Sequence, residues 1–241
     1  MEQPRVAVIT GAGSGIGRAT AILLAARGFA VVLVGRRPES LSDTADRLPE
    51  GASHLEVPAD VGDSASAASM IDRTVQRFGR LDVLINNAGF APLIPIDEHH
   101  PPVIDECYRV NALGPAYAIA RAWPVFKKQG SGCIVNISTV GTIDPFEGFF
   151  GYAASKAAVN LMAKSCAKEG RAFGVRAFAV APGAVETDML RAIIPESKLP
   201  RSKTMSPERV AAVILECIQG RHDAKNGQVI VVNDGAEGGH S

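Results

Sequence analysis

The sequence predicts an α/β fold, a single domain over residues 1–241 with a doubly wound parallel sheet of about seven strands and helices on both faces. Short apolar runs alternate with longer segments of helical periodicity along the chain, as in repeated βαβ crossovers. Most of these runs are continuously hydrophobic, which is typical of strands buried on both faces of a parallel sheet. A glycine-rich turn directly after the first run indicates a ligand crevice beyond the carboxyl ends of the strands.

Seven apolar runs are expected to be strands, and they cover residues 5–10, 30–34, 54–57, 81–86, 133–137, 176–181 and 228–232. The segments between them repeat apolar residues at helical spacing and are expected to be helices over 16–27, 39–48, 65–78, 102–127, 152–173 and 207–219. The last helix has the clearest start, because Ser206 can cap it and Pro207 suits its first position. Pro115 and Pro124 are expected to bend the 102–127 helix or cut it short.

The composition argues against several classes of partner. The 25 basic side chains balance 25 acidic ones, so no strong field attracts nucleic acid or anionic membranes. No apolar run approaches the roughly 18 residues that a membrane span needs, and the N-terminus lacks a signal-peptide core. We therefore expect a cytoplasmic protein whose partner is a small molecule.

The cysteines and histidines do not have the spacing of metal ligands. The four cysteines are widely spread and are expected to be buried, reduced thiols: Cys107, Cys133, Cys166 and Cys217. His99 and His100 precede two prolines and are expected to be solvated loop residues. We expect no metal site.

The turn after the first strand predicts a phosphate-binding loop. It reads Thr-Gly-x-x-x-Gly-x-Gly over residues 10–17 and leads at once into a helix. Glycines let the backbone approach a pyrophosphate, and the helix N-terminus presents free N–H groups to it. The residues expected to contact a dinucleotide there are Gly11, Gly13, Ser14, Gly15, Ile16 and Gly17.

The end of the second strand favours NADP(H) over NAD(H). An NAD enzyme commonly has an acid here for the ribose 2′-hydroxyl, whereas this chain has Arg36 and Arg37 after a glycine. A guanidinium can bind a 2′-phosphate bidentately, although two loop arginines can also be merely solvated. The ends of the third and fourth strands offer further groups to the adenine and ribose, namely Asp60, Val61, Asn87, Ala88 and Gly89.

Tyr152 and Lys156 are a candidate proton-transfer pair. Residues four apart lie one above the other on a helix, so the ammonium can sit beside the phenol and favour its phenolate. The pattern alone is also compatible with surface packing.

Taken together, these residues resemble the short-chain dehydrogenase/reductase family in its short form of about 250 residues. The resemblance covers nearly the whole chain and rests on residues 10–17, 60–61, 86–89, Asn111, Tyr152 with Lys156, and Pro182, Gly183 and Thr187. It implies a Rossmann-like fold and a nicotinamide-dependent oxidoreductase.

The resemblance also implies a role for each matched residue. Tyr152 would be the general acid or base, and Lys156 would lower its pKa and hydrogen-bond the nicotinamide ribose. Asn111 would hold a water that links the lysine to solvent, or would be a helix-interior polar residue satisfied locally. The nicotinamide carboxamide would be held by Pro182, Gly183, Val185 and Thr187.

This chain departs from the family at the hydroxyl that orients the substrate carbonyl. The family usually has two serines after this strand, whereas this chain has Ser138 and Thr139. Thr139 has the family's spacing of 13 residues before Tyr152 and is preferred, while Ser138 keeps the relation to Gly141 and stays possible. Either hydroxyl can donate to a carbonyl oxygen.

The sequence thus predicts an NADP-dependent oxidoreductase acting on a carbonyl compound or a secondary alcohol. The alternatives are a non-catalytic NAD(P)-binding regulatory or scaffold protein on the same fold, and a sugar-nucleotide epimerase, for which the segment after Thr187 is too short.

We expect the connecting loops after the strands, which vary in this fold, to form the walls of the substrate pocket. A lid over residues 188–206 carries basic side chains that could bind an anionic acyl carrier or be solvated. Phe146, Phe149 and Phe150 could line an apolar pocket or a subunit contact. The resemblance further implies a homo-oligomer, a tetramer or dimer built on the two long helices.

Overall fold

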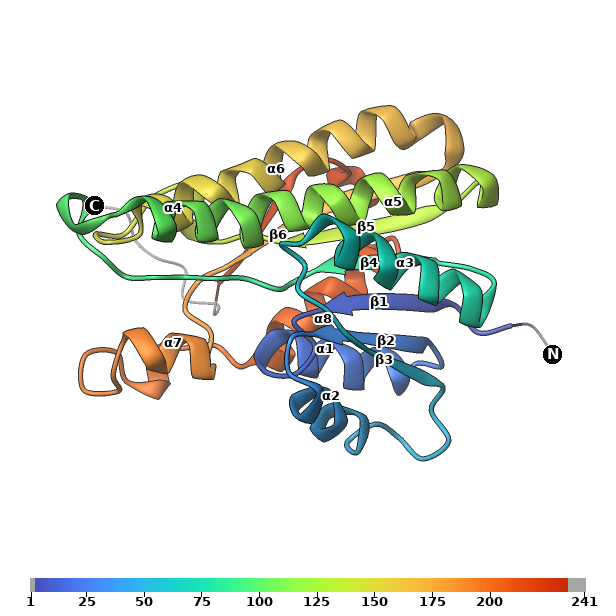
Figure 1. Ribbon diagram of the computed structural model, residues 1–241, viewed down its shortest axis with the longest axis horizontal. Coiled ribbons are helices and arrows are strands. Elements are labelled where there is room, and N and C mark those ends of the chain that lie inside the picture. The colour runs from blue at the N-terminus through green and yellow to red at the C-terminus, as the bar shows by residue number, and fades with distance from the viewer. Residues whose placement is uncertain (1–2, 234–241) are drawn as a thin grey trace.

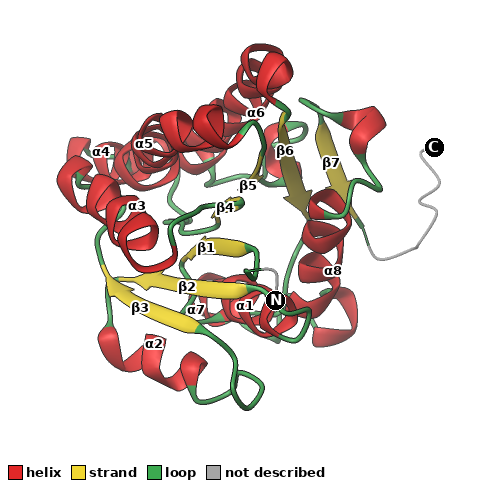
Figure 2. Ribbon diagram, turned by 90° about the vertical axis from the view of Figure 1, so that its right-hand side faces the viewer, coloured by secondary structure: helices red, strands yellow, loops and turns green. Residues whose placement is uncertain are grey.

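The computed structural model describes residues 3–233, and the two ends of the predicted domain lie outside the described residues. Seven strands of this part of the chain form one parallel sheet in the order β3-β2-β1-β4-β5-β6-β7 (Figures 1 and 2). They are β1 (Val6–Thr10), β2 (Ala30–Gly35), β3 (His54–Pro58), β4 (Val83–Asn86), β5 (Gly132–Ile137), β6 (Val175–Pro182) and β7 (Val229–Val232). The predicted fold class is confirmed.

Helices pack on both faces of the sheet, and Figure 2 separates the two layers. The α-helices of the described residues are α1 (Gly15–Ala25), α2 (Pro38–Ala45), α3 (Ser64–Phe78), α4 (Pro101–Tyr108), α5 (Gly114–Gln129), α6 (Phe150–Gly170), α7 (Asp188–Ile193) and α8 (Pro207–Ile218). The predicted cap of α8 is present, since the Ser206 hydroxyl accepts a hydrogen bond from the Arg209 N–H at 3.3 Å. Helix α7 lies inside the predicted lid and had no periodic signal of its own.

The two helical layers explain the continuous hydrophobicity of the strands. In β1, Ala7 and Ile9 belong to one apolar cluster with Leu24 of α1, on the face that α8 also covers. Val6 and Val8 point the opposite way and pack in a second cluster on the α3, α5 and α6 face. Because side chains alternate along a strand, covering both faces requires apolar residues at every position.

The long helix predicted over 102–127 is not cut short by its prolines. Helix α4 continues through a π-helical turn, Arg109–Leu113, into α5, which runs past Pro124 to Gln129. In the π turn the Gly114 N–H donates to the Arg109 carbonyl, five residues back. The widened turn lies directly before Pro115, whose nitrogen carries no hydrogen to donate, so the helix accommodates this proline by a local widening.

The prediction for the four cysteines is confirmed, since all are free and buried. The prediction for His99 is wrong. Its ring is partly buried against Phe150 at a centroid distance of 5.5 Å, and its Nδ1 lies 2.9 Å from the Pro95 carbonyl. His100 is exposed as expected.

Residues 3–233 contain neither a helix suited to span a membrane nor a cluster of metal ligands. None of the helices there has the length and apolar character needed to cross a membrane. Within the same residues, no group of three or more histidine, cysteine or acidic side chains is placed to hold a metal ion.

Candidate active site

A cleft of about 1330 Å³ lies at the carboxyl ends of the strands, where β1 stands between β2 and β4. The chain leaves β1 towards α1 on one face of the sheet and leaves β4 towards α4 and α5 on the other face, so the two loops diverge and leave a crevice. Every residue expected from the sequence to bind the cofactor or act in catalysis lines this cleft except Gly17 and Asn111, which are buried.

The glycines form the cradle that a pyrophosphate requires. Gly11 has a φ of +66°, and a Cβ there would lie 2.8 Å from the Asn87 amide nitrogen. At Gly17 a Cβ would collide with the Gly11 carbonyl oxygen, and at Gly13 it would lie 2.8 Å from the Ser40 Cβ. The turn therefore has room for backbone only, which fits the diphosphate of a dinucleotide above the α1 N-terminus.

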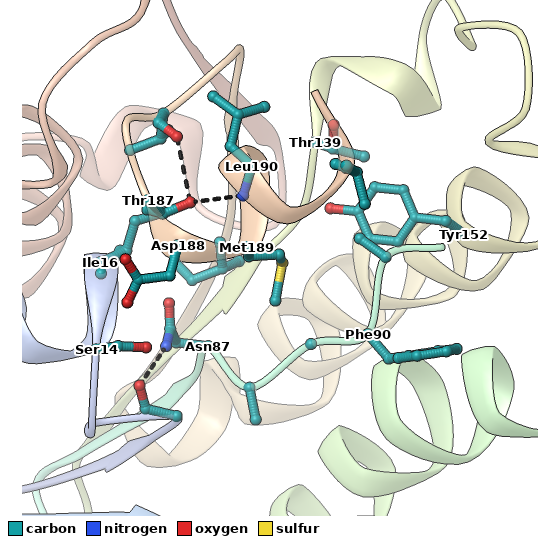
Figure 3. Close-up of a pocket in the computed structure, with 18 of the residues that line it drawn as sticks. Ser14, Ile16, Asn87, Phe90, Thr139, Tyr152, Thr187, Asp188, Met189 and Leu190 are labelled. Atoms are coloured by element: carbon teal, nitrogen blue, oxygen red, sulfur yellow. Dashed lines mark hydrogen bonds between the residues drawn. The ribbon is translucent and has the colours of Figure 1, made fainter. Parts of the chain in front are cut away.

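Thr10 and Asn87 hold the floor of the cleft together. The Thr10 hydroxyl oxygen accepts hydrogen bonds from the backbone N–H groups of Asn87 at 2.9 Å and Ala88 at 3.0 Å. The Asn87 side chain donates to the Thr10 carbonyl at 2.8 Å. Asn87 lies beside Ser14 in Figure 3. These bonds fix the loop after β4 against the glycine turn.

The adenosine end of the cleft carries the two arginines and an ion-paired acid. Arg36 and Arg37 are exposed and line the cleft after β2. Asp60 accepts from Arg109 at 2.8 Å and from the Gly62 N–H at 3.0 Å. Burial raises the pKa of Asp60, but these hydrogen bonds and the charges of Arg109 and Arg36 outweigh it, so the net pKa is lowered. No motif in the sequence predicted Arg109 as the partner of Asp60.

Tyr152 and Lys156 both face the cleft from the first turns of α6. Lys156 is 4% exposed, and its ammonium donates to the Ile137 carbonyl at the end of β5 at 2.8 Å. Burial lowers the pKa of Lys156 to about 8. Burial of the phenol raises the pKa of Tyr152 to about 12, against a smaller lowering by a hydrogen bond with Thr139. The free chain therefore keeps the tyrosine protonated at neutral pH.

The two hydroxyls after β5 differ in what they face. The Thr139 side chain forms a hydrogen bond with the Tyr152 phenol and lies beside its ring in Figure 3. It also accepts a hydrogen bond from the Gly141 N–H at 3.2 Å, which fixes its rotamer. Ser138 lines the cleft but is 2% exposed, and its hydroxyl has no hydrogen-bond partner among the described residues.

Asn111 lies in the π turn and is fully buried. Its side chain accepts from the Phe90 N–H at 2.9 Å and donates to the Phe90 carbonyl at 2.8 Å. It also donates to the Ser155 hydroxyl at 3.0 Å. The amide thus ties the loop after β4 to α6, next to Lys156. The sequence did not reveal Ser155 as its partner, because the two residues are 44 positions apart.

Thr187 begins the lid. Its hydroxyl donates to the Val185 carbonyl at 3.2 Å and accepts from the Leu190 N–H at 3.2 Å, so it caps α7 (Figure 3). Val185 pairs with Met205 in an isolated bridge, which closes the base of the lid. The backbone from Pro182 to Val185 borders the cleft along the same edge.

Comparison with known proteins agrees with this geometry. A family model described as short chain dehydrogenase matches residues 5–198. The chain belongs to the short-chain dehydrogenase/reductase family. It is therefore an oxidoreductase that acts on a carbonyl or alcohol with a nicotinamide cofactor.

Particular relatives cover nearly the whole chain. Levodione reductase of Leifsonia aquatica is 34% identical over 228 residues, 93% of this chain and 82% of that protein. A crystal structure of levodione reductase superposes with a TM-score of 0.89 at 30% identity, covering 95% of this chain and 96% of the other. A 3-ketoacyl-(acyl-carrier-protein) reductase from Brucella melitensis, complexed with NADH, has a TM-score of 0.89 at 27% identity over 96% and 97% of the two chains.

The buried ammonium predicts a pH dependence of stability. Lys156 has a folded pKa of about 8 and an ordinary value of 10.5, so the unfolded chain binds the extra proton between these values. The free energy of unfolding of the wild type, relative to Lys156→Met, should therefore rise from pH 8 to 10.5, by roughly 3 kcal/mol at most. Below pH 8 the difference should be flat. Urea titrations of both proteins measure it, and a difference that falls over this interval would contradict the assignment.

Proposed function

We propose that this protein is an NADP-dependent reductase or dehydrogenase in which Tyr152 is the proton donor and acceptor. The observation that carries this proposal is the placement of Tyr152, Lys156 and Thr139 in one cleft with the glycine cradle. When bound, the nicotinamide cofactor supplies or accepts the hydride. The residues expected to hold it are the glycine turn, Arg36, Arg37, Asp60, Val61, residues 87–89 and residues 182–187.

The side chains around Tyr152 support a general acid. With its pKa raised to about 12 by burial, the phenol carries its proton at neutral pH and can deliver it to a carbonyl oxygen. Thr139 is placed to donate to the same oxygen while its position is fixed by Gly141. Lys156 lies one turn further along α6, and its positive charge would stabilise the phenolate that remains. Asn111 is proposed as a positioning residue, because it fixes the loop that borders Lys156.

Tyr152→Phe tests the enzyme against the non-catalytic alternative. Removing one hydroxyl deletes the proton donor, so kcat for NADPH-dependent reduction should fall about 10²-fold or more. Binding of NADPH, measured by calorimetry, should change little because the ring still fills its place. Steady NADPH oxidation by the wild type that persists unchanged in the variant would contradict the role of Tyr152. Tight NADPH binding by the wild type without turnover of any carbonyl compound would favour a scaffold.

Thr139→Val and Ser138→Ala separate the two hydroxyls. Thr139→Val removes the donor next to Tyr152 and should lower kcat by about 10²-fold. Thr139→Ser keeps the hydroxyl and its bond to Gly141, so it should retain most of the activity. Ser138→Ala removes an unpaired buried hydroxyl and should leave kcat within a few-fold of the wild type. A large loss in Ser138→Ala with a mild effect in Thr139→Val would reverse the assignment.

The preference for NADP rests on Arg36 and Arg37. They lie exposed in the cleft directly after β2, where an NAD enzyme commonly has an acid. Arg36→Ala should weaken NADPH binding by roughly 1.5 to 3 kcal/mol and leave NADH binding almost unchanged, because only NADPH carries the 2′-phosphate. Arg73→Ala, an exposed arginine on α3 away from the cleft, is the matched control. Equal losses for both nucleotides would refute the preference. The Brucella reductase structure shows that a chain of this fold can bind NADH, so the fold alone does not fix the preference.

The proposed homo-oligomer is supported by the outer surface of the two long helices. Figure 1 shows α4 and α5 running beside α6 along one side of the molecule. Large apolar side chains are exposed on these helices and the turn between them, including Tyr108 at 41%, Leu113 at 45% and Leu161 at 65%. Contact between copies of the chain would bury them.

A further inference from the structure

The end of the cleft nearest Tyr152 is walled mainly by apolar side chains. They come from the loops after β4 and β5 and from the lid, and include Phe90, Leu93, Phe146, Phe149, Met189 and Ile193. In Figure 3 the lid residues Met189 and Leu190 lie on the side of the cleft that the Tyr152 hydroxyl faces. A substrate carbonyl at Tyr152 therefore has hydrocarbon around the rest of its molecule.

The three phenylalanines of the loop before α6 divide into two groups. Phe149 packs on Tyr152 at a ring-centroid distance of 5.3 Å, and Phe146 contacts Phe149 at 6.2 Å, so an aromatic row leads from the phenol outward. Phe146 is 58% exposed while lining the cleft, which leaves much of its ring available to a ligand. Phe150 turns away and packs edge-on against His99.

The basic residues of the lid do not make this end of the cleft positive. Glu186 accepts two hydrogen bonds from Arg191, at 2.9 and 2.5 Å, and lies 3.6 Å from Arg201. The Thr204 hydroxyl donates to the same carboxylate at 2.9 Å. The Arg191 hydrogen bond, with smaller contributions from Thr204 and Arg201, lowers the pKa of Glu186 to about 2, so the carboxylate is charged at neutral pH.

The charges that remain on the lid side of the cleft wall have no positive excess. Arg201 also pairs with Glu196 at 3.3 Å. Of the four basic lid residues, Lys198 alone lines the cleft, where the acids Asp188 and Glu147 line it too. An anionic substrate would meet no net positive charge there, and it would lose hydration against apolar walls.

We propose that the substrate is an uncharged, largely apolar ketone or secondary alcohol whose hydrocarbon part packs against Phe146 and Phe149. Glu186 acts as a specificity determinant, because it holds the lid arginines and so withholds their charge from anionic compounds. This inference rests on the proposed function, since it concerns the same cleft. It disfavours the acyl-carrier substrate that the basic lid sequence suggested.

Matched pairs of ketones test the substrate class. Each pair keeps the carbonyl and changes one distant group: 4-methylcyclohexanone against 4-oxocyclohexanecarboxylate, and 4-methylacetophenone against 4-acetylbenzoate. The wild type should show a kcat/KM at least about tenfold higher for the methyl member of a pair that it reduces. Equal or higher kcat/KM for the carboxylates would overturn the proposal.

Phe146→Ala and Phe150→Ala form a matched pair of exposed phenylalanines, one in the cleft and one outside it. Phe146→Ala should lower kcat/KM for the methyl compounds about fivefold to tenfold, mainly through KM, and leave the KM for NADPH unchanged. Phe150→Ala should leave both values unchanged. Equal effects of the two substitutions would show that the aromatic row does not contact the substrate.

Glu186→Gln tests the charge argument. The uncharged amide keeps the size of the side chain but removes the negative charge that Arg191 and Arg201 share, so the lid becomes more positive by one charge. The ratio of kcat/KM for the carboxylate to that for the methyl compound should rise several-fold, and added salt should reverse the rise. An unchanged ratio would overturn the role of Glu186, even if both rates fell through loosening of the lid.

Failure of the substrate class and failure of the proposed function give different results. Turnover of the carboxylates rather than the methyl compounds would refute the class alone. If the wild type reduced none of the four ketones while still binding NADPH, the proposed function would be in question. Calorimetric titration of the same pairs into the NADP-bound protein would then decide the class, since stronger binding of the methyl member supports it and stronger binding of the carboxylate refutes it.

Discussion

The close approach of two loops, at the ends of β1 and β4, determines the rest of the site. Thr10 and Asn87 join these loops through hydrogen bonds of 2.8 to 3.0 Å between side chain and backbone. The approach is possible because Gly11 and Gly17 present no side chain between them. A methyl group at either position would push the loops apart and fill the space above the α1 N-terminus. The cradle for the diphosphate and the positions of the residues beyond it therefore depend on backbone packing.

The reactive end of the cleft depends on burial. Lys156 is charged yet 4% exposed, and one carbonyl from β5 compensates part of the cost of removing its ammonium from water. The same burial keeps the phenol of Tyr152 neutral, with Thr139 as its nearest polar partner. Desolvation therefore shifts the two pKa values in opposite directions, 12 for the acid and 8 for the amine. Both groups therefore carry their protons at neutral pH in the free chain, and the phenol needs nearby positive charge before it can act as a base.

The substrate end shows how local sequence can mislead about charge. Arg191 and Arg201 make the lid look like an anion-binding segment, yet Glu186, which precedes the lid, binds both. The phenylalanines before α6 likewise could not be assigned to the cleft from the sequence alone. Three phenylalanines lie within five positions of one another, but two face the cleft and the third packs against His99.

Much of this protein was predictable from local patterns. The apolar runs and intervening helical segments specified the parallel sheet, because strands covered on both faces need hydrophobic residues at every position. The glycine turn, Arg36 and the Tyr152 and Lys156 pair could be located because each follows a strand or begins a helix. Only the tertiary structure decided which hydroxyl faces Tyr152 and which groups bind Asn111 and Lys156. It also decided how the helix accommodates Pro115 and which carboxylate pairs with the arginines of the lid. Those outcomes depend on contacts between residues far apart in the chain, such as Asn111 with Ser155 and Lys156 with Ile137, and no local periodicity encodes them.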